Sequence, residues 1–157
     1  MESIGFTHHD HAACVGGGLK AAEDVCAAKG LRLTKGRRRV LEILLQEHRA
    51  MGAYDILGLL SDEGFASQPP VVYRALDFLV DNGFVHKIEK LNAYVACTHP
   101  QDEHAPVFLI CRKCDTVAET AVSLRTSLGS AAKEMGFKIE STTVEALGLC
   151  PSCQEAA

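Results

Sequence analysis

Apolar residues recur with the 3.6-residue period of an amphipathic helix in four segments of the first half of the chain. The four predicted helices cover residues 19–29, Thr34 through Leu45, 53–63, and the stretch from Pro70 to the Asn82-Gly83 stop. Thr34 is a suitable N-terminal cap, and proline suits the first turn of the fourth helix. In that helix the apolar stripe leaves Tyr73 and Arg74 pointing elsewhere.

Two short β-type runs follow the fourth helix, over residues 84–88 and 94–97, with a polar connection between them. This spacing predicts a β-hairpin. Helices followed by a small hairpin, with a helix–turn–helix step between Ala53 and Val80, indicate a winged helix-turn-helix. A helical bundle with an additional hairpin is the alternative that the pattern leaves open.

The polar segment 98–104 breaks regular structure and marks a domain boundary. Beyond it the pattern predicts strands over 107–111 and 117–121, a helix from Leu124 to Met135, and a long strand over 137–149. We therefore predict an α+β chain with four parts: a disordered tail (1–18), a helical domain with a hairpin (19–97), a hinge (98–105) and a small α/β domain (106–157). The last part is short enough to need a metal staple or a partner subunit.

Hydrophobic residues make up 47% of the 157-residue chain and charged residues 23%, which excludes a disordered or low-complexity protein. No apolar run approaches the roughly 18 residues that a membrane-spanning helix needs. The N-terminus carries acidic residues and histidines where a secretory signal has basic and apolar stretches. We expect a cytoplasmic protein with no membrane association.

The net charge of −4 is distributed unevenly. Residues 17–96 hold 11 Lys and Arg against 10 Asp and Glu, so the acidic excess lies outside this section. Between Arg32 and Arg39 the chain has five basic residues and no acidic one, a local cationic surface of the kind that attracts phosphates. A solvated helix start explains the same run equally well.

Four of the seven cysteines form two CxxC pairs, Cys111 with Cys114 and Cys150 with Cys153. Disulfides are disfavoured in a chain without a secretion signal, so metal binding is the better interpretation. The spacing lets both thiolates of a pair face one ion, and four thiolates at about 2.3 Å make a closed tetrahedral zinc site. Because it has no open position, such a site is structural.

Two catalytic interpretations of the CxxC pairs compete with structural zinc. Cys-Pro-Ser-Cys is similar to a glutaredoxin dithiol, whose reactivity depends on a helix N-terminus. Only four residues follow Cys153, too few for that helix. A zinc deaminase needs an upstream His-x-Glu, which this chain lacks. We therefore expect no enzyme and no small-molecule substrate, and a dithiol oxidoreductase remains the alternative from a different class.

A second group of potential ligands consists of His86, Cys97, His99, His104 and Glu119. Each has an ordinary explanation as a strand, core or loop residue, and spacing alone does not decide for metal. A third group, His8, His9, His11 and Cys14, lies in the predicted tail before three glycines. It is either a weak zinc collector or a solvated tail.

Four blocks of the sequence together resemble the ferric uptake regulator family. They are Arg32–Leu41, Ala53–Leu57, Pro69–Leu76 and the two CxxC pairs, and the resemblance covers about residues 19–153. Within that family, Gly83–Glu89 and Asn92–Cys97 are similar to the zinc-responsive branch. The chain departs from the family at Lys35, where proline is usual, and at Val71, where threonine is more common and offers a hydroxyl to a phosphate.

The resemblance implies a homodimeric repressor that binds double-stranded operator DNA in response to zinc and controls zinc-uptake genes. Its fold would be an N-terminal winged helix-turn-helix followed by a small α/β dimerisation domain with the four-cysteine zinc site. Two Zn²⁺ per subunit are implied, one structural and one regulatory, the latter held by His86, Cys97, His104 and Glu119 with His99 in reserve. A thiolate in this set favours zinc over iron. The nearest alternative is an iron or peroxide sensor of the same family, which would be expected to lack a sulfur ligand. A zinc-stapled interaction module without DNA affinity is a third class.

By the same resemblance the fourth helix is the recognition helix. Tyr73 and Arg74 would lie on the DNA side, with Arg74 suited to a guanine edge and Tyr54 as another base contact. Arg37, Arg38 and Arg39 would hold phosphates without reading sequence. Core packing is the alternative for Tyr73. Because the regulatory ligands come from the hairpin, the hinge and the C-terminal domain, zinc would fix the angle between two bodies and raise the DNA-competent fraction.

Overall fold

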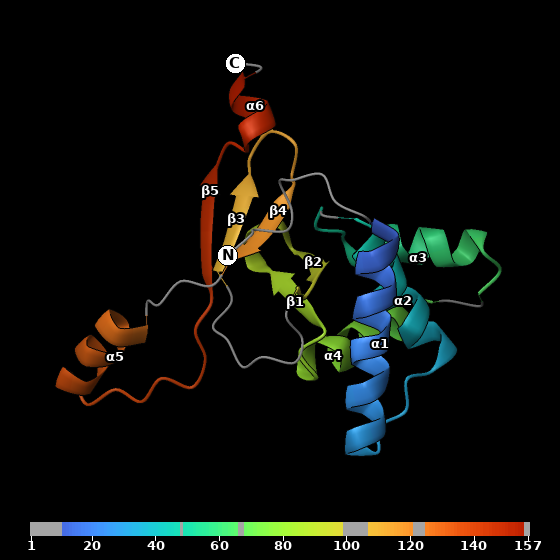
Figure 1. Cartoon of the computed structure of the whole chain (residues 1–157), viewed down its shortest axis with the longest axis horizontal. Coiled ribbons are helices and arrows are strands. Elements are labelled where there is room, and N and C mark those ends of the chain that lie inside the picture. Colours follow the sequence, from blue (N-terminus) through green and yellow to red (C-terminus); the bar gives the residue numbers. More distant parts are fainter. Residues whose placement is uncertain (1–10, 48, 66–67, 99–106, 121–124, 156–157) are drawn as a thin grey trace.

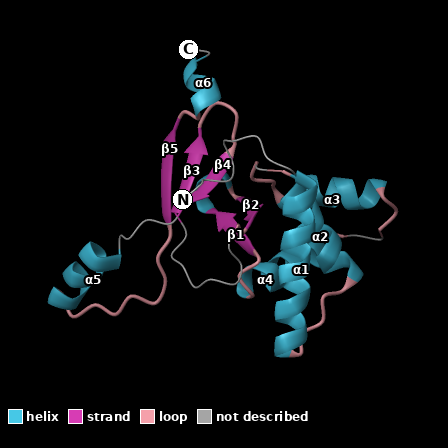
Figure 2. Ribbon diagram, viewed as in Figure 1, coloured by secondary structure: helices cyan, strands magenta, loops and turns pink. Residues whose placement is uncertain are grey.

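The computed structural model describes residues 11–47, 49–65, 68–98, 107–120 and 125–155. Along these residues four helices come first and strands with two further helices follow, so the chain is α+β, as predicted (Figures 1 and 2). The N-terminal elements are α1 (His11–Lys29), α2 (Lys35–Gln46), α3 (Ala53–Asp62), α4 (Pro69–Asp81), β1 (Val85–Ile88), the 3-10 turn η1 (Glu89–Leu91) and β2 (Ala93–Ala96). The C-terminal elements are β3 (Val107–Cys111), β4 (Val117–Thr120), α5 (Arg125–Glu134), β5 (Val144–Gly148) and α6 (Pro151–Glu155).

Helices α1 to α4 pack around one apolar core, to which each contributes buried residues of its apolar stripe, although Leu59 of α3 is 42% exposed. Thr34 caps α2 as expected, since its hydroxyl oxygen accepts a hydrogen bond from the Arg37 N–H at 3.3 Å. α3 and α4 form the predicted helix–turn–helix step beside α2 (Figure 1). No helix in the described part of the chain has both the length and the apolar character to cross a bilayer.

The first helix begins earlier than the sequence pattern indicates. α1 starts at His11, so the predicted tail and its three glycines are helical from that residue on. A Cβ added at Gly18 would lie 2.6 Å from Cδ2 of Leu45, whereas Gly16 and Gly17 have nothing within 4 Å. Glycine at position 18 therefore allows α1 to approach α2 closely, and this tertiary contact outweighs the low helix propensity of glycine.

The predicted hairpin is present, and both of its faces are buried. β1 and β2 pair antiparallel, with Val85 opposite Ala96 and His86 opposite Val95. One face, which includes Val85 and Tyr94, packs on the helical core; the other, which includes Ile88 and Val95, packs on the C-terminal sheet. The hairpin, which we call the wing, is thus a layer between the helices and that sheet (Figure 1).

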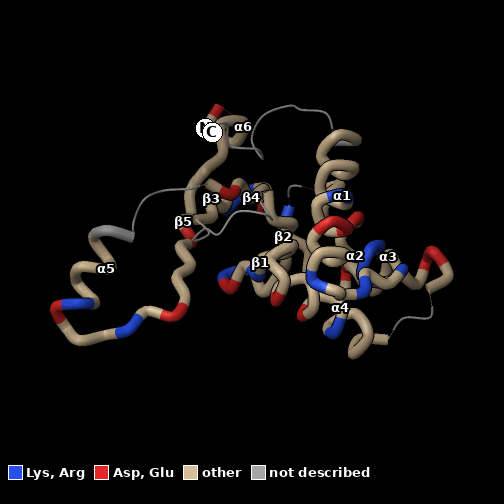
Figure 3. Tube along the Cα trace, turned by 60° about the horizontal axis from the view of Figure 1, so that its bottom comes forward, with Lys and Arg blue, Asp and Glu red and all other residues tan. Residues whose placement is uncertain are grey.

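The C-terminal sheet has the order β4-β3-β5, with β4 antiparallel and β5 parallel to β3. The predicted long strand over 137–149 is wrong in length, because only Val144–Gly148 is a strand. Its first part has no strand partner among the described residues and runs as a connection from α5. That helix stands apart from the sheet in both views of the chain (Figures 1 and 3).

An apolar cluster joins the wing to the C-terminal sheet. It consists of buried residues from both sides of the predicted boundary: Ile88, Val95, Phe108, Ile110 and Val117. The segment between α2 and α3 also contacts the C-terminal part, since Arg49 forms an isolated antiparallel bridge with Thr116. The two predicted domains therefore share a packed interface, and the wing belongs to both.

Candidate metal centres and DNA-binding face

The two CxxC pairs converge on one point. The sulfur atoms of Cys111, Cys114, Cys150 and Cys153 all lie within 4.8 Å of one another. Cys111 ends β3, Cys150 follows β5 and Cys153 lies in α6, so the parallel pairing of β3 with β5 brings the pairs together. Four sulfurs bound at about 2.3 Å to one tetrahedral zinc are about 3.8 Å apart. The Cys114 and Cys150 sulfurs are 3.8 Å apart, which fits that geometry.

The surroundings of the cluster favour thiolate at two positions. Backbone hydrogen bonds from Cys150 and Cys114 lower the pKa of Cys111 to about 6. The Thr116 hydroxyl, 3.1 Å from the Cys114 sulfur, lowers the pKa of Cys114. Hydrogen bonding to Cys150 raises the pKa of Cys153 to about 12, because neighbouring sulfurs resist a further negative charge. A divalent cation removes that repulsion, and the donor set fits zinc.

One argument against a redox dithiol is wrong. We expected no helix at the Cys150-Pro-Ser-Cys153 motif, yet α6 begins at Pro151, directly after Cys150. A helix N-terminus is therefore present, although it belongs to a single short turn. The convergence of all four sulfurs is what separates this arrangement from a dithiol, since a redox pair does not need a second CxxC in contact.

A second ligand cluster lies between the wing and the C-terminal sheet. One donor atom each of His86, Cys97 and Glu119 lies within 4.8 Å of the other two. His86 Nε2 is 3.3 Å and Cys97 Sγ is 3.9 Å from Glu119 Oε1. In a tetrahedral zinc site with ordinary bond lengths, the distance from nitrogen to oxygen is about 3.3 Å and the distance from sulfur to oxygen is about 3.6 Å. The imidazole, thiol and carboxylate therefore fit one ion. Glu119, at 6% exposure, is a buried acid in this part of the chain.

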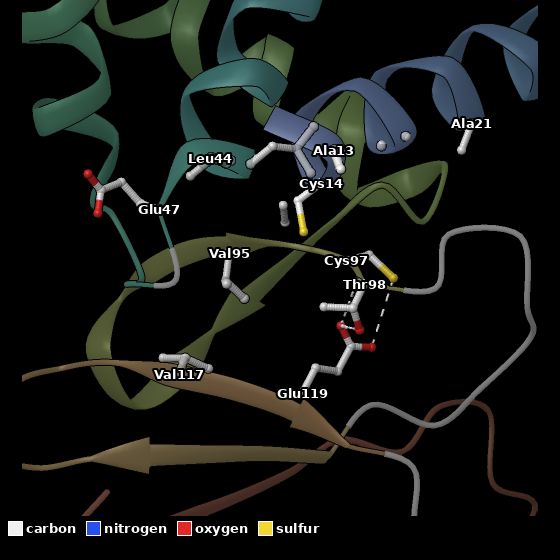
Figure 4. Close-up of a pocket in the computed structure, with 14 residues that line it drawn as sticks. Ala13, Cys14, Ala21, Leu44, Glu47, Val95, Cys97, Thr98, Val117 and Glu119 are labelled. Atoms are coloured by element: carbon white, nitrogen blue, oxygen red, sulfur yellow. Dashed lines mark hydrogen bonds between the residues drawn. The ribbon is translucent and has the colours of Figure 1, made fainter. Parts of the chain in front are cut away.

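The carboxylate of Glu119 is held by the residue that follows Cys97. The Thr98 N–H donates to Glu119 Oε2 at 3.0 Å, and the Thr98 hydroxyl donates to the same oxygen at 3.3 Å (Figure 4). These bonds leave Oε1 directed toward the sulfur and the imidazole. Oriented carboxylates of this kind are typical of metal sites.

A cavity of about 240 Å³ adjoins this cluster. Its walls come from α1, the end of α2, the wing and β4, and they include Cys14, Gly17, Cys97 and Glu119. Figure 4 shows the Cys14 side chain facing this space from α1. The cavity gives the second cluster an opening beneath α1.

Several predicted ligands are not tested by this structure. His104 and the reserve ligand His99 lie outside the described residues, as do His8 and His9. His11 begins α1, and Cys14 is in that helix and not in a disordered tail. The structure thus brings together three of the four residues predicted for the regulatory site.

The predicted base-contacting residues are all exposed. Tyr54 in α3 is 69% exposed, Tyr73 in α4 is 40% exposed, and Arg74 beside it is also exposed. The two tyrosines border one hollow between α3 and α4. Core packing, the alternative considered for Tyr73, is therefore wrong.

The three arginines of α2 all make contacts within the chain. Arg37 donates to the Arg32 carbonyl at 2.7 Å, and its guanidinium lies 3.8 Å from the centre of the Phe78 ring. Arg38 pairs with Glu23, and Arg39 pairs with both Glu42 and Glu63. Basic and acidic positions are accordingly interleaved over the helices in Figure 3. This surface is less purely cationic than the run of basic residues suggests.

The sequence profile described as "Ferric uptake regulator family" matches residues 28–147. This chain belongs to that family. It is 41% identical over 139 residues to the zinc uptake regulation protein of Escherichia coli K12, a match covering 87% of this chain and 81% of that protein.

Two solved relatives extend this comparison. A "Zinc Uptake Regulator Complexed With Zinc AND DNA" superposes with a TM-score of 0.86 at 39% identity, covering 90% of this chain and 96% of that one. The holo form of XcZur superposes with a TM-score of 0.79 at 42% identity, covering 88% of this chain and 97% of that one. The apo form of the same protein superposes with a TM-score of 0.53 at 39% identity, covering 90% of this chain and 98% of that one.

Proposed function

We propose that this chain is a zinc-responsive transcriptional repressor that binds operator DNA as a homodimer and controls zinc-uptake genes. The observation that carries the proposal is the second ligand cluster, because it joins the wing of a helix-turn-helix to the C-terminal sheet. A site in that position links metal occupancy to the placement of the DNA-reading helices. The family membership and the relatives named above agree with this assignment.

The regulatory site would consist of His86, Cys97, Glu119 and, from the resemblance, His104. Zinc supplies a divalent centre that all four ligands can share when it is bound. The chain's own contribution is to bring His86 and Cys97 on the wing against Glu119 on the sheet, with Thr98 orienting the carboxylate. The presence of a thiol favours zinc over the iron and peroxide alternatives. The four-cysteine cluster would bind a second zinc and hold the C-terminal part together.

The packing of the wing on the C-terminal sheet supports the proposal that this is the conformation that binds DNA. A dimer reads two half-sites about 34 Å apart only when both recognition helices are held at that spacing. The chain superposes better with the holo than with the apo form of one relative, as expected for a wing packed against the sheet. Metal occupancy would raise the population of this arrangement, and the apparent DNA affinity would rise with it.

The C-terminal part supports the homodimer. Its described residues expose a set of large apolar side chains: Leu109, Leu128, Met135, Phe137 and Leu147. Met135 and Phe137, which follow the end of α5 at Glu134, are 83% and 67% exposed, and α5 stands away from its own sheet. Several large apolar side chains left uncovered within one chain are typical of a subunit interface.

The test combines metal analysis with DNA binding. The natively purified protein is expected to hold two zinc ions per subunit, one of which is removed by mild chelation. A duplex selected from a randomised pool by the zinc-loaded protein should bind only when the labile ion is restored. Cys97→Ser should abolish this dependence while the tightly held zinc remains, and Cys26→Ser, a buried cysteine outside both clusters, serves as the control. A dithiol oxidoreductase would instead reduce insulin and lack tightly bound zinc, and normal zinc dependence in Cys97→Ser would falsify the assigned site.

A further inference from the structure

The turn at the tip of the wing lacks a cap from its own neighbours. η1 spans Glu89–Leu91, and Ile88, at its N-cap position, offers no side-chain hydrogen bond. The first N–H groups of such a turn have no partner within it and need an acceptor from elsewhere. Two of them donate to one carboxylate of β5: Glu89 N–H to Glu145 Oε1 at 2.7 Å, and Lys90 N–H to Glu145 Oε2 at 3.1 Å. A residue 56 positions along the chain therefore caps the wing tip.

Glu145 and the regulatory ligand Glu119 occupy equivalent places on the sheet. Both are register partners of Phe108, Glu119 from β4 and Glu145 from β5. Phe108 is fully buried, and its ring meets the His86 ring edge-on with centroids 5.3 Å apart. Paired residues of adjacent strands point to the same face, so one row of three side chains meets the wing. The two carboxylates are two strand spacings apart, roughly 10 Å.

We propose that Glu145 is a positioning residue for DNA binding, a second attachment that holds the wing tip to the sheet. This inference rests on the proposed function. The apolar cluster between the wing and the sheet is non-directional, and the polar contacts of His86, Cys97 and Glu119 hold the wing on only one side of Phe108. An attachment on the other side of Phe108 restricts rotation of the wing, so that closing the ligand cluster also fixes the orientation of α4. Because a carboxylate accepting two N–H groups makes strong charge-assisted bonds, it is well suited to this role.

The first experiment replaces the acceptor. Glu145→Gln keeps the shape of the side chain but presents an N–H₂ group to one of the two donors. At saturating zinc we expect the affinity for the selected duplex to fall about tenfold, as expected when the competent fraction falls to about one tenth. Zinc content per subunit should remain unchanged. Glu140→Gln, the same change at an exposed residue before β5, should leave DNA binding unaltered.

The second experiment replaces a donor. Glu89 is the first residue of η1, where proline is accommodated, and Ile88 before it already has the extended backbone that precedes proline well. Glu89→Pro removes one N–H and leaves Glu145 in place. If both variants act through this contact, the double variant should lose no more affinity than the more severe single variant. Additive losses would contradict a shared mechanism.

Hydrogen exchange separates positioning from simple support. The amides of Glu89 and Lys90 should lose protection in Glu145→Gln but not in Glu140→Gln. Loss of protection with unchanged DNA affinity would overturn the inference, as would equal affinity of the wild type and Glu145→Gln in any folded preparation. Failure of the wild type itself to bind DNA in response to zinc would instead count against the proposed function, so the two failures are distinguishable.

Discussion

The Nε2 atom of His86 lies 3.3 Å from Oε1 of Glu119, although the two residues belong to the wing and to the C-terminal sheet. Cys97, at the end of the wing, reaches the same oxygen. At this contact a bound metal ion would act on the relation between the wing and the C-terminal sheet. The expected effect of a substitution therefore depends on whether it alters a ligand, an orienting residue, a DNA contact or the packing of the helices.

Thr98 should tune zinc affinity without binding zinc. Thr98→Val removes the hydroxyl that donates to Glu119 Oε2 and keeps the backbone donor. Loss of such an outer partner typically weakens metal affinity by about 10- to 100-fold, so the zinc concentration for half-maximal DNA binding should rise by at least about tenfold. A zinc titration followed by duplex anisotropy measures the shift. Thr116→Val is the matched control, because its hydroxyl serves the four-cysteine cluster and its loss should leave this midpoint unchanged.

Arg74 and Arg39 should differ in their effect on DNA binding. Arg74 is exposed on α4, whereas the Arg39 guanidinium is held by Glu42 and Glu63. Arg74→Ala is expected to weaken binding to the selected duplex by about 1–3 kcal/mol, the value of a bidentate base contact. Arg39→Ala should change DNA affinity less and lower the melting temperature more. The reverse ranking would show that Arg39 leaves its acidic partners to contact DNA.

The pair of Arg39 and Glu63 should make part of the stability dependent on pH. The hydrogen bond from Arg39 lowers the pKa of Glu63 from its usual 4.5. Because the folded state binds the proton less tightly, the pair contributes fully to the free energy of unfolding above about pH 4.5. This contribution is lost as the pH falls through the lowered pKa of Glu63. Glu63→Gln should therefore melt at a lower temperature than wild type at pH 7, and the difference should shrink below about pH 4. Asp62→Asn, beside it on α3, should show no such convergence.

Gly16 and Gly18 of α1 should respond differently to alanine. Gly16→Ala adds a methyl group with nothing within 4 Å and gains helix propensity of up to about 1 kcal/mol. Its melting temperature should rise by roughly 2–4 °C. Gly18→Ala places the methyl group 2.6 Å from Leu45 and should cancel the gain or reverse it. Differential scanning calorimetry of the two variants checks the comparison, and an equal rise in both would mean that α1 does not pack there.

Local sequence signals predicted the elements whose contacts are close in sequence. The period of α2, its Thr34 cap and the helix–turn–helix all depend on nearby residues, and each is confirmed. Each CxxC pair is also a local signal, although the convergence of the two pairs depends on the pairing of β3 with β5. The early start of α1 was missed because Gly16, Gly17 and Gly18 favour coil, and its contacts with distant residues, such as Gly18 with Leu45 and Val15 with the helical core, are not visible in a local pattern.

The candidate site shows the same limit. Spacing alone left His86, Cys97 and Glu119 with ordinary explanations, and the resemblance to a family was needed to group them. Their convergence depends on strand registers that bring distant positions of the chain to one row, which no local pattern encodes. Thr98 and Glu145 carried no sequence signal at all, because their roles depend on hydrogen bonds across that interface.

Because both faces of the wing are buried, the contrast between an apolar and a polar face does not oppose a one-residue shift in the pairing of its strands. Where only one face is apolar, a slip by one residue exposes the core side and is rejected; here either face finds an apolar neighbour. The length of η1 and the left-handed backbone of Asn92, with φ of 46°, then determine that His86 pairs with Val95. Deleting one residue of this turn would shift the two strands of the wing against each other, so that His86 no longer pairs with Val95. A connection that touches no proposed ligand atom would thereby decide whether His86, Cys97 and Glu119 converge.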